Sequence, residues 1–313
     1  MNKFLIAVLS IIFSHSIHAE SNARLKFDIS TRLSLNQTND EIGSMTPLGF
    51  DYHNTIADTH SDVGTFVLQL YATKINNLSP HPPFFDEEND FKLVTRIFNF
   101  NYTGLGRSLP NVKVGHIELP YGIEYRVNTN GTLRQYSHGM NLGPKADWGI
   151  SLNKQHENLE YEFSLTTGGG QDFTNQNNSY VFTGYIGTPS HHNFHYGVSV
   201  NKSEINRFER ESLAFDAAYY YQLWSMFLEI QVGSKGGLDH HQAFAELNYT
   251  TSSHDWLFYL QTRYTETENT TTRKDLIVGG KYRLTTDLSG SVQVIEFIEQ
   301  NTTQVLAQLR YRF

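Results

Sequence analysis

Apolar and polar residues alternate with a period of two along most of the chain. Residues 24–36 are apolar at odd positions, apart from Thr31, and charged or polar at even positions. Residues 305–313 alternate in the same way, apart from Leu306, and end on Phe313. Because successive side chains point to opposite faces only in a β-strand, this pattern predicts strands with one apolar and one polar face.

Segments with this alternation recur along the whole chain and are about ten residues long, the length that a tilted strand needs to cross a bilayer. Strands in soluble sandwiches are shorter, about five or six residues. We predict sixteen strands, over residues 24–36, 47–57, 63–75, 91–102, 111–119, 146–154, 159–167, 179–188, 194–202, 212–221, 224–233, 240–250, 255–264, 274–284, 288–297 and 303–313. The predicted fold class is therefore all-β, a transmembrane antiparallel β-barrel. The second segment rests on Leu48, Phe50 and Tyr52 alone, and since such barrels have even strand numbers, fourteen strands is the alternative.

The connectors between the predicted strands alternate in length. Short connectors at 155–158, 189–193, 222–223, 251–254 and 285–287 alternate with mostly longer ones at 120–145, 168–178, 203–211, 234–239 and 265–273. Short turns at one end and longer loops at the other are typical of outer-membrane barrels. Unpaired backbone groups are costly in lipid, so the sheet must close, and sixteen strands enclose a lumen that side chains cannot fill. We therefore expect a water-filled pore.

Charged residues occupy the inward-facing parity of many predicted strands. Basic residues lie near the two chain ends, and acidic residues lie in the middle strands: Lys26, Arg32, Arg263, Lys281, Arg283, Arg310 and Arg312, against Glu160, Glu162, Asp216, Glu229 and Glu246. Opposed walls of this kind would create a transverse electric field that filters ions. The alternative is that these side chains only keep the lumen hydrated.

The connector 120–145 is the longest between well-defined strands, and it is rich in turn-forming and polar residues. Long loops inside compact folds are usually functional. Folded into the lumen, this loop would form a constriction lined by Glu124, Arg126, Arg134 and Lys145, with Glu118 at the end of the preceding strand. The alternative is an external loop that lies over the barrel mouth.

Composition excludes several classes of protein. The chain has 313 residues, 13% of them aromatic, which is too much apolar surface for a disordered chain. It has no cysteine, which removes disulfides and thiolate sites, and its net charge of -8 argues against a nucleic-acid partner. Clusters such as 191–195 and 239–241 contain histidines, but they lie at turns and strand edges, so we predict no metal and no cofactor.

The first residues have the layout of a secretory signal peptide: Lys3 near the start, an apolar run over 4–13, and a small residue, Ala19, before the expected cleavage site. The apolar run is too short to span a bilayer, which takes about 20 helical residues. We therefore expect residues 1–19 to be removed and residues 20–313 to form a single barrel domain in the outer membrane of a Gram-negative bacterium.

Residues 112–124, Val-Lys-Val-Gly-His-Ile-Glu-Leu-Pro-Tyr-Gly-Ile-Glu, resemble a strand-and-loop signature of the phosphate-selective porins of the O/P type, and the terminal Phe313 resembles the C-terminal signature of outer-membrane barrels. The resemblance implies sixteen strands, a constriction loop at this place in the chain, and a homotrimer. The loop lacks the dense lysines that phosphate selectivity requires, so the resemblance is applied to the pore and not to an anion preference.

No Gly-x-Ser-x-Gly or His-Glu-x-x-His motif occurs in the chain. Pairs such as Asp239–His240 and Ser253–His254 are neighbours in sequence, and strand neighbours point to opposite faces. We therefore expect a non-enzymatic porin for small hydrophilic solutes. The alternatives are a barrel scaffold that sheathes a partner such as an electron-transfer cytochrome, and an outer-membrane hydrolase.

Overall fold

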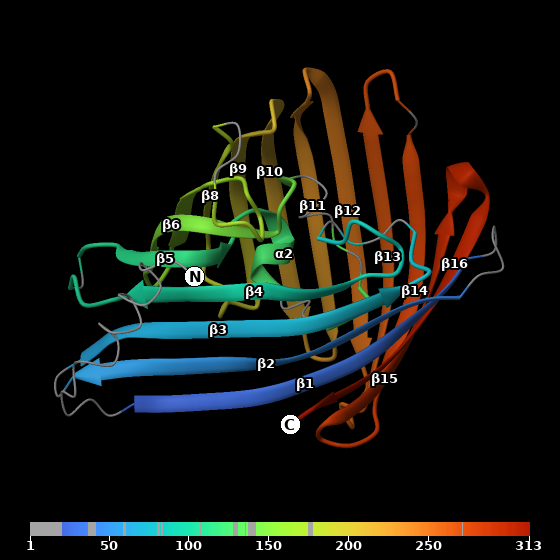
Figure 1. Cartoon of the computed structure of the whole chain (residues 1–313), viewed down its shortest axis with the longest axis horizontal. Helices are drawn as coiled ribbons and strands as arrows, with labels where there is room; N and C mark the ends of the chain where they lie inside the picture. Colours follow the sequence, from blue (N-terminus) through green and yellow to red (C-terminus); the bar gives the residue numbers. More distant parts are fainter. Residues whose placement is uncertain are drawn as a thin grey trace.

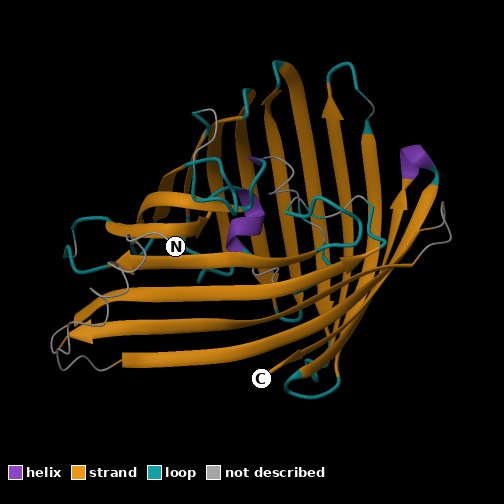
Figure 2. Cartoon of the chain, in the orientation of Figure 1, coloured by secondary structure: helices purple, strands orange, loops and turns teal. Residues whose placement is uncertain are grey.

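A computed structural model describes residues 21–36, 42–58, 61–79, 82, 84–106, 108–127, 131–134, 136, 142–174, 178–270 and 272–313. The signal peptide predicted for residues 1–19 lies outside this part of the chain. The described residues form a closed barrel of sixteen antiparallel strands, in which each strand pairs with its neighbours in sequence (Figures 1 and 2). The prediction of an all-β barrel with sixteen strands is confirmed, and the alternative of fourteen is wrong.

The strands are β1 Ser21–Asn36, β2 Ile42–Asp58, β3 Ser61–Asn76, β4 Phe91–Tyr102, β5 Asn111–Glu118, β6 Ala146–Gln155, β7 Glu160–Thr166, β8 Tyr180–Gly187, β9 Phe194–Ile205, β10 Phe208–Tyr221, β11 Trp224–Lys235, β12 Leu238–Thr250, β13 Trp256–Thr267, β14 Arg273–Arg283, β15 Leu288–Phe297 and β16 Thr302–Arg312. A short helix α2, Gly122–Arg126, and a 3₁₀ turn η1, Ile298–Gln300, complete the described elements. Neither described helix has the length or hydropathy of a membrane-spanning helix.

Pairing between the first and last strands closes the barrel. Ile29 of β1 lies opposite Tyr311 of β16, and the ladder continues to Asn36 and Gln304. The terminal Phe313 extends the contact, because its N–H donates to the carbonyl oxygen of Phe27 at 3.0 Å and its carbonyl oxygen accepts from the Phe27 N–H at 2.8 Å. The first and last described strands therefore close the sheet along residues 27–36 of β1.

The faces of the barrel wall are inverted relative to a soluble protein. In β9 the apolar side chains of Phe194, Tyr196 and Val198 are exposed, while the polar side chains of His195 and Ser199, at the alternate positions, are buried. Most other strands expose large apolar residues in the same way. The outer surface of the barrel is therefore an apolar belt, and the polar face of each strand points inward.

Three connectors are shorter than the sequence predicts, and the one expected at 265–273 spans only 268–272. The loops expected at 203–211 and 234–239 are two-residue turns, Asn206-Arg207 and Gly236-Gly237, because the flanking strands extend further than predicted. All four turn residues have positive φ, between 52° and 80°. Consecutive left-handed residues make the tight hairpin turn that suits the twist of two paired strands. The predicted contrast between short and long connectors therefore holds only for part of the barrel.

Candidate pore and constriction

The segment after β5 turns into the barrel and forms helix α2 against the inner side of β9, β10 and β11 (Figure 2). The backbone N–H of Gly122 donates to Ser199 Oγ at 2.9 Å, and the N–H of Ile123 donates to Glu229 Oε2 at 2.7 Å. Gly122 has a φ of +66°, and a Cβ at this position would lie 2.2 Å from Glu229 Oε2. A glycine is therefore needed where the loop meets the wall.

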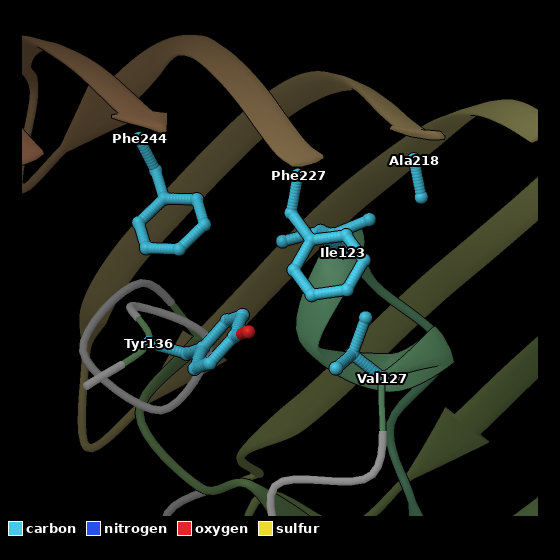
Figure 3. Close-up of a cluster of buried hydrophobic side chains, with 6 residues drawn as sticks. All are labelled: Ile123, Val127, Tyr136, Ala218, Phe227 and Phe244. Atoms are coloured by element: carbon cyan, nitrogen blue, oxygen red, sulfur yellow. The ribbon is translucent and has the colours of Figure 1, made fainter. Parts of the chain in front are cut away.

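Apolar side chains pack the loop onto this wall. Ile123, Val127 and Tyr136 of the loop form one buried cluster with residues of β10, β11 and β12 (Figure 3). The wall residues of the cluster are Ala218, Phe227 and Phe244. A second buried cluster packs Leu119, Tyr121 and Leu142 of the loop segment against Val181 and Ala214 of the wall. These apolar wall residues are where the loop contacts the barrel.

Buried ion pairs join the same loop to the acidic strands. The Arg126 guanidinium lies 3.3 Å from Asp216 Oδ1 and 3.3 Å from Glu160 Oε1. Arg134 Nη1 donates to Glu246 Oε1 at 2.9 Å. The side chains of Arg126 and Asp216 are 1% and 0% exposed, so these pairs are shielded from water. Charge pairs in such surroundings depend on each other, because either partner alone would be a buried unpaired charge.

Two loop tyrosines add hydrogen bonds to the acidic wall. Tyr125 donates its hydroxyl to Glu162 Oε2 at 2.6 Å, and Tyr136 donates to Glu246 at 3.1 Å. Burial raises the pKa of the Tyr136 hydroxyl well above its ordinary value, so the group stays protonated and remains a donor. Lys113 of β5 also pairs with Glu162, at 2.7 Å.

The predicted acidic residues therefore lie under the loop. Glu162, Glu229 and Glu246 are 4%, 5% and 1% exposed, and Glu160 is partly buried beside Arg126. The sequence interpretation placed these carboxylates against open water, opposite a basic wall. It differs from the structure because the loop supplies the cations and N–H groups that face them.

The far end of the loop reaches the basic side of the barrel. Arg310 Nη1 of β16 donates to the carbonyl oxygen of Gly131 at 3.3 Å, and Arg310 Nε donates to Asp28 Oδ1 at 2.9 Å. Next to this pair, Arg312 lies 2.5 Å from Asp51 Oδ2. The loop thus bridges the lumen from the acidic wall to β16.

Two cavities lie on the basic side of the lumen. The loop-side cavity, about 530 Å³, is bounded by β1 to β5 and the loop, and it contains Glu118, Glu124, Lys145, Arg134 and Arg32 among its lining residues. The turn-side cavity, about 440 Å³, lies next to the 285–287 turn, and its charged lining residues are Lys26, Lys281, Arg283, Arg310, Arg312, Asp255 and Asp287. Arg310 lines the turn-side cavity and contacts Gly131 of the loop-side cavity, so the two cavities meet there.

Of the basic residues predicted on the barrel wall, Arg263 is the one that lines neither cavity. Its guanidinium is buried and lies 2.5 Å from Asp275 Oδ2 of the next strand. Lys145 pairs with Glu124 inside the loop itself.

Sequence reasoning missed the inward carboxylates Asp28 and Asp51, although Asp28 has the same parity as Lys26 and Arg32 in residues 24–36. Parity alone would have found it.

No group of three metal-binding side chains occurs among the described residues. Within the predicted histidine clusters, His195 is buried and stacks on Tyr220 with ring centroids 5.6 Å apart. His240 is also buried, with its Nδ1 2.8 Å from Thr267 Oγ1. Each of these two rings therefore packs against side chains of the barrel wall.

Comparison with known proteins places the fold. No family model and no curated protein matches the chain. Among solved structures, the anion-selective porin from Comamonas acidovorans is 11% identical over 94% of this chain and 100% of its own, with a TM-score of 0.67. OmpF of Salmonella typhi, in complex with daunomycin, is 12% identical over 93% of this chain and 97% of its own, also at 0.67. OmpT of Vibrio cholerae, in its trimer form, is 9% identical over 94% and 99%, at 0.64. At these identities the likeness concerns the fold, and the chain has the closed β-barrel fold of these bacterial outer-membrane proteins.

Proposed function

We propose that the chain is a porin of the bacterial outer membrane that lets small hydrophilic solutes diffuse passively through its lumen. The inverted wall carries this proposal: its apolar outer belt suits lipid, and its polar inner face suits water. The fold similarity supports the same function. Export by a signal peptide over residues 1–19 belongs to this proposal, as does the absence of an enzymatic activity and of a cofactor.

The loop 120–145 is the constriction in this proposal. Its support is that described loop residues contact both sides of the lumen, Arg134 at Glu246 and Gly131 at Arg310. A solute must then pass beside the loop, where Arg32, Arg134, Glu118 and Lys145 are within the lining. The loop sets the size limit because it occupies the width of the barrel next to the acidic wall.

The charge of the remaining path favours anions. Five basic residues line the turn-side cavity against Asp255 and Asp287. Three of them are paired, Arg283 with Asp255, Arg310 with Asp28 and Arg312 with Asp51. Among the described residues no carboxylate lies within ion-pair distance of Lys26 or Lys281, so these two lysines carry the excess positive charge. The carboxylates that would oppose them across the lumen, such as Glu162 and Glu246, are buried and paired with Lys113 and Arg134. A pore lined by an excess of one charge concentrates counter-ions of the opposite sign, so we propose a preference for anions although the whole chain carries a net charge of -8.

Planar-bilayer recording of refolded residues 20–313 in a KCl gradient tests the proposal. Stable current steps are expected, with a reversal potential of the sign that chloride preference requires. The double variant Lys26→Gln and Lys281→Gln removes two charges from the turn-side cavity and is expected to lower the chloride-to-potassium permeability ratio about two- to threefold. Folded protein that gives no current would contradict the porin, and current with potassium preference would contradict only the anion preference.

A matched control removes the same charge from the outer face. Lys202 and Lys274 are 63% and 48% exposed and pair with Glu211 and Glu299. The double variant Lys202→Gln and Lys274→Gln is expected to leave the permeability ratio unchanged, because neither side chain lines a cavity of the lumen. An equal change in both double variants would mean that total charge sets the ratio.

One finer feature, the oligomeric state, completes the proposal. A homotrimer is inferred from the resemblance of residues 112–124 to the phosphate-selective porins of the O/P type, and a neighbour of the same fold is described in a trimer form. Chemical cross-linking of the folded protein in detergent is the measurement that tests it, with a three-chain product expected. A monomer at every cross-linker concentration would contradict the trimer and the resemblance that implies it.

A further inference from the structure

The barrel wall has a notch where the constriction loop leaves it. Strand β5 ends at Glu118. Its ladder with β4 covers only residues Phe98 to Tyr102 of β4. Strand β4 begins at Phe91, so its residues 91–97 have no partner in β5. Unpaired backbone groups in a wall that faces lipid cost several kcal/mol each. Something other than β5 must therefore satisfy this edge.

The connector between β7 and β8 covers the notch. We call its residues 167–173 the wall strap. The Gln171 side chain accepts from the backbone N–H of Thr95 at 2.8 Å and donates to the Thr95 carbonyl oxygen at 2.8 Å. These two bonds reproduce the pair that a neighbouring strand would make. The strap thus crosses the ends of β5 and β6 and pairs with the edge of β4.

Asp147 of β6 anchors the strap. Its carboxylate is fully buried and accepts from Gly168 N–H at 2.5 Å, from Gly170 N–H at 2.9 Å and from Thr167 Oγ1 at 3.2 Å. Gly168 and Gly170 have φ of +77° and +60°, which glycine adopts readily and which lets both N–H groups point at one carboxylate. A buried carboxylate with several such donors is a rigid attachment point.

Three aromatic side chains give the strap further contacts. Trp148 Nε1 donates to the carbonyl oxygen of Gln171 at 3.2 Å, and the Phe173 ring lies 5.3 Å from the Trp148 ring. The His116 ring lies between two carbonyl oxygens, 3.0 Å from that of Arg96 on β4 and 3.1 Å from that of Gly170 on the strap. The strap is therefore bonded to β4, β5 and β6 together.

We infer that the wall strap closes the notch and holds the base of the constriction loop, with Gln171 and Asp147 as positioning residues. The loop leaves the wall after Glu118 and rejoins it at Ala146, and both residues line the loop-side cavity together with Thr95 and Gln171. Gln171 thus stands between this cavity and the outside of the barrel. Without the strap, the edge of β4 opens and the base of the loop loses its support. The effect on current rests on the proposed porin function, whereas the closure of the notch does not.

The variant Gln171→Ala tests this inference because it removes both bonds to Thr95. Amide hydrogen exchange is measured at Thr95 in folded protein, and at least about tenfold faster exchange is expected in Gln171→Ala. Gln171→Glu keeps the acceptor for the Thr95 N–H, so the Thr95 amide is expected to exchange more slowly in this variant than in Gln171→Ala. Gln155→Ala, at the opposite end of the β6–β7 hairpin, is the matched control and should leave the exchange rate of the Thr95 amide unchanged. Heat-modifiable mobility establishes that each variant is folded.

Single-channel recording supplies the second readout. Gln171→Ala is expected to show several-fold more brief closures and current noise than the wild type, because the base of the loop moves, while Gln155→Ala is expected to match the wild type. Unchanged exchange at Thr95 in Gln171→Ala would overturn the closure of the notch. Faster exchange with wild-type current would overturn the role in positioning the loop. A wild-type protein without current refutes the porin, and the exchange measurement still decides on the strap.

Discussion

At the scale of single residues, the surroundings of a carboxylate decide what it contributes. Glu246 is almost fully buried and accepts from Arg134 and from Tyr136, both on the loop. Glu211 lies on the outer side of the barrel and pairs with Lys202 at 2.7 Å, with both side chains more than half exposed. The first pair is shielded from water, so removing one charge leaves the other buried without an opposite charge. The second pair is screened by solvent.

Replacing Glu246 by Gln keeps the shape of the side chain and removes the charge opposite Arg134. We expect the free energy of unfolding to fall by about 3 kcal/mol, the cost of removing the negative charge from a buried ion pair. Urea unfolding followed by tryptophan fluorescence measures this change. Glu211→Gln is the matched control and should cost less than about 1 kcal/mol. Equal losses in the two variants would show that Glu246 is not part of a buried pair.

At the scale of elements, the loop between β5 and β6 begins with the short helix α2, and its described residues contact both sides of the lumen. Its apolar residues, Ile123, Val127 and Tyr136, pack on the wall, and its polar groups bond to inward-facing residues of several strands. The described residues of the loop are held at many points, so the proposed constriction is a fixed part of the structure.

Shortening the loop within residues 125–140 is expected to raise single-channel conductance, about twofold or more, because the obstruction beside the cavities becomes smaller. Planar-bilayer recording of the refolded variant measures this change. Shortening the turn 103–110, at the other end of the barrel, by two residues is the control and should leave the conductance near that of the wild type. An unchanged conductance in the loop variant would rule out the constriction.

At the scale of the whole molecule, neighbouring residues in one strand face different surroundings. On β15, Val292 is 55% exposed on the apolar outer belt, while Ser291 next to it faces the lumen and is partly buried. The outer belt is stable only in an apolar medium, whereas the inner face requires water or polar partners.

An arginine at each of these two positions tests the orientation of the barrel. Val292→Arg is expected to lower the folding free energy in lipid vesicles by about 2–4 kcal/mol, the cost of an arginine near the middle of a bilayer. Ser291→Arg introduces the same group toward the lumen and should cost less. Reversible folding from urea into vesicles provides the measurement. A larger loss for Ser291→Arg would mean that the inner and outer faces are exchanged.

Strand number and strand orientation could be predicted because they depend on local pattern. The segment 47–57, the weakest in the sequence, is a full strand, since its neighbours β1 and β3 pair with it along its length. The turn at Asn206-Arg207 was missed because two left-handed residues close a hairpin without any glycine to mark it. The irregular pairing of β3 with β4 after Gln69 likewise leaves no clear mark in the alternation.

The sequence by itself determined the barrel: its period-two alternation set the strands, their length and their inward faces, because side-chain direction in a strand depends only on position. The tertiary structure alone decided which inward charges meet water. Arg134 and Glu246 are 112 residues apart, and Arg126 and Asp216 are 90 apart, so no local pattern reveals that they meet. Once the loop folds inward, these contacts bury the acidic wall and leave the basic residues beside the cavities, because a charge is neutralised by whatever the fold places next to it.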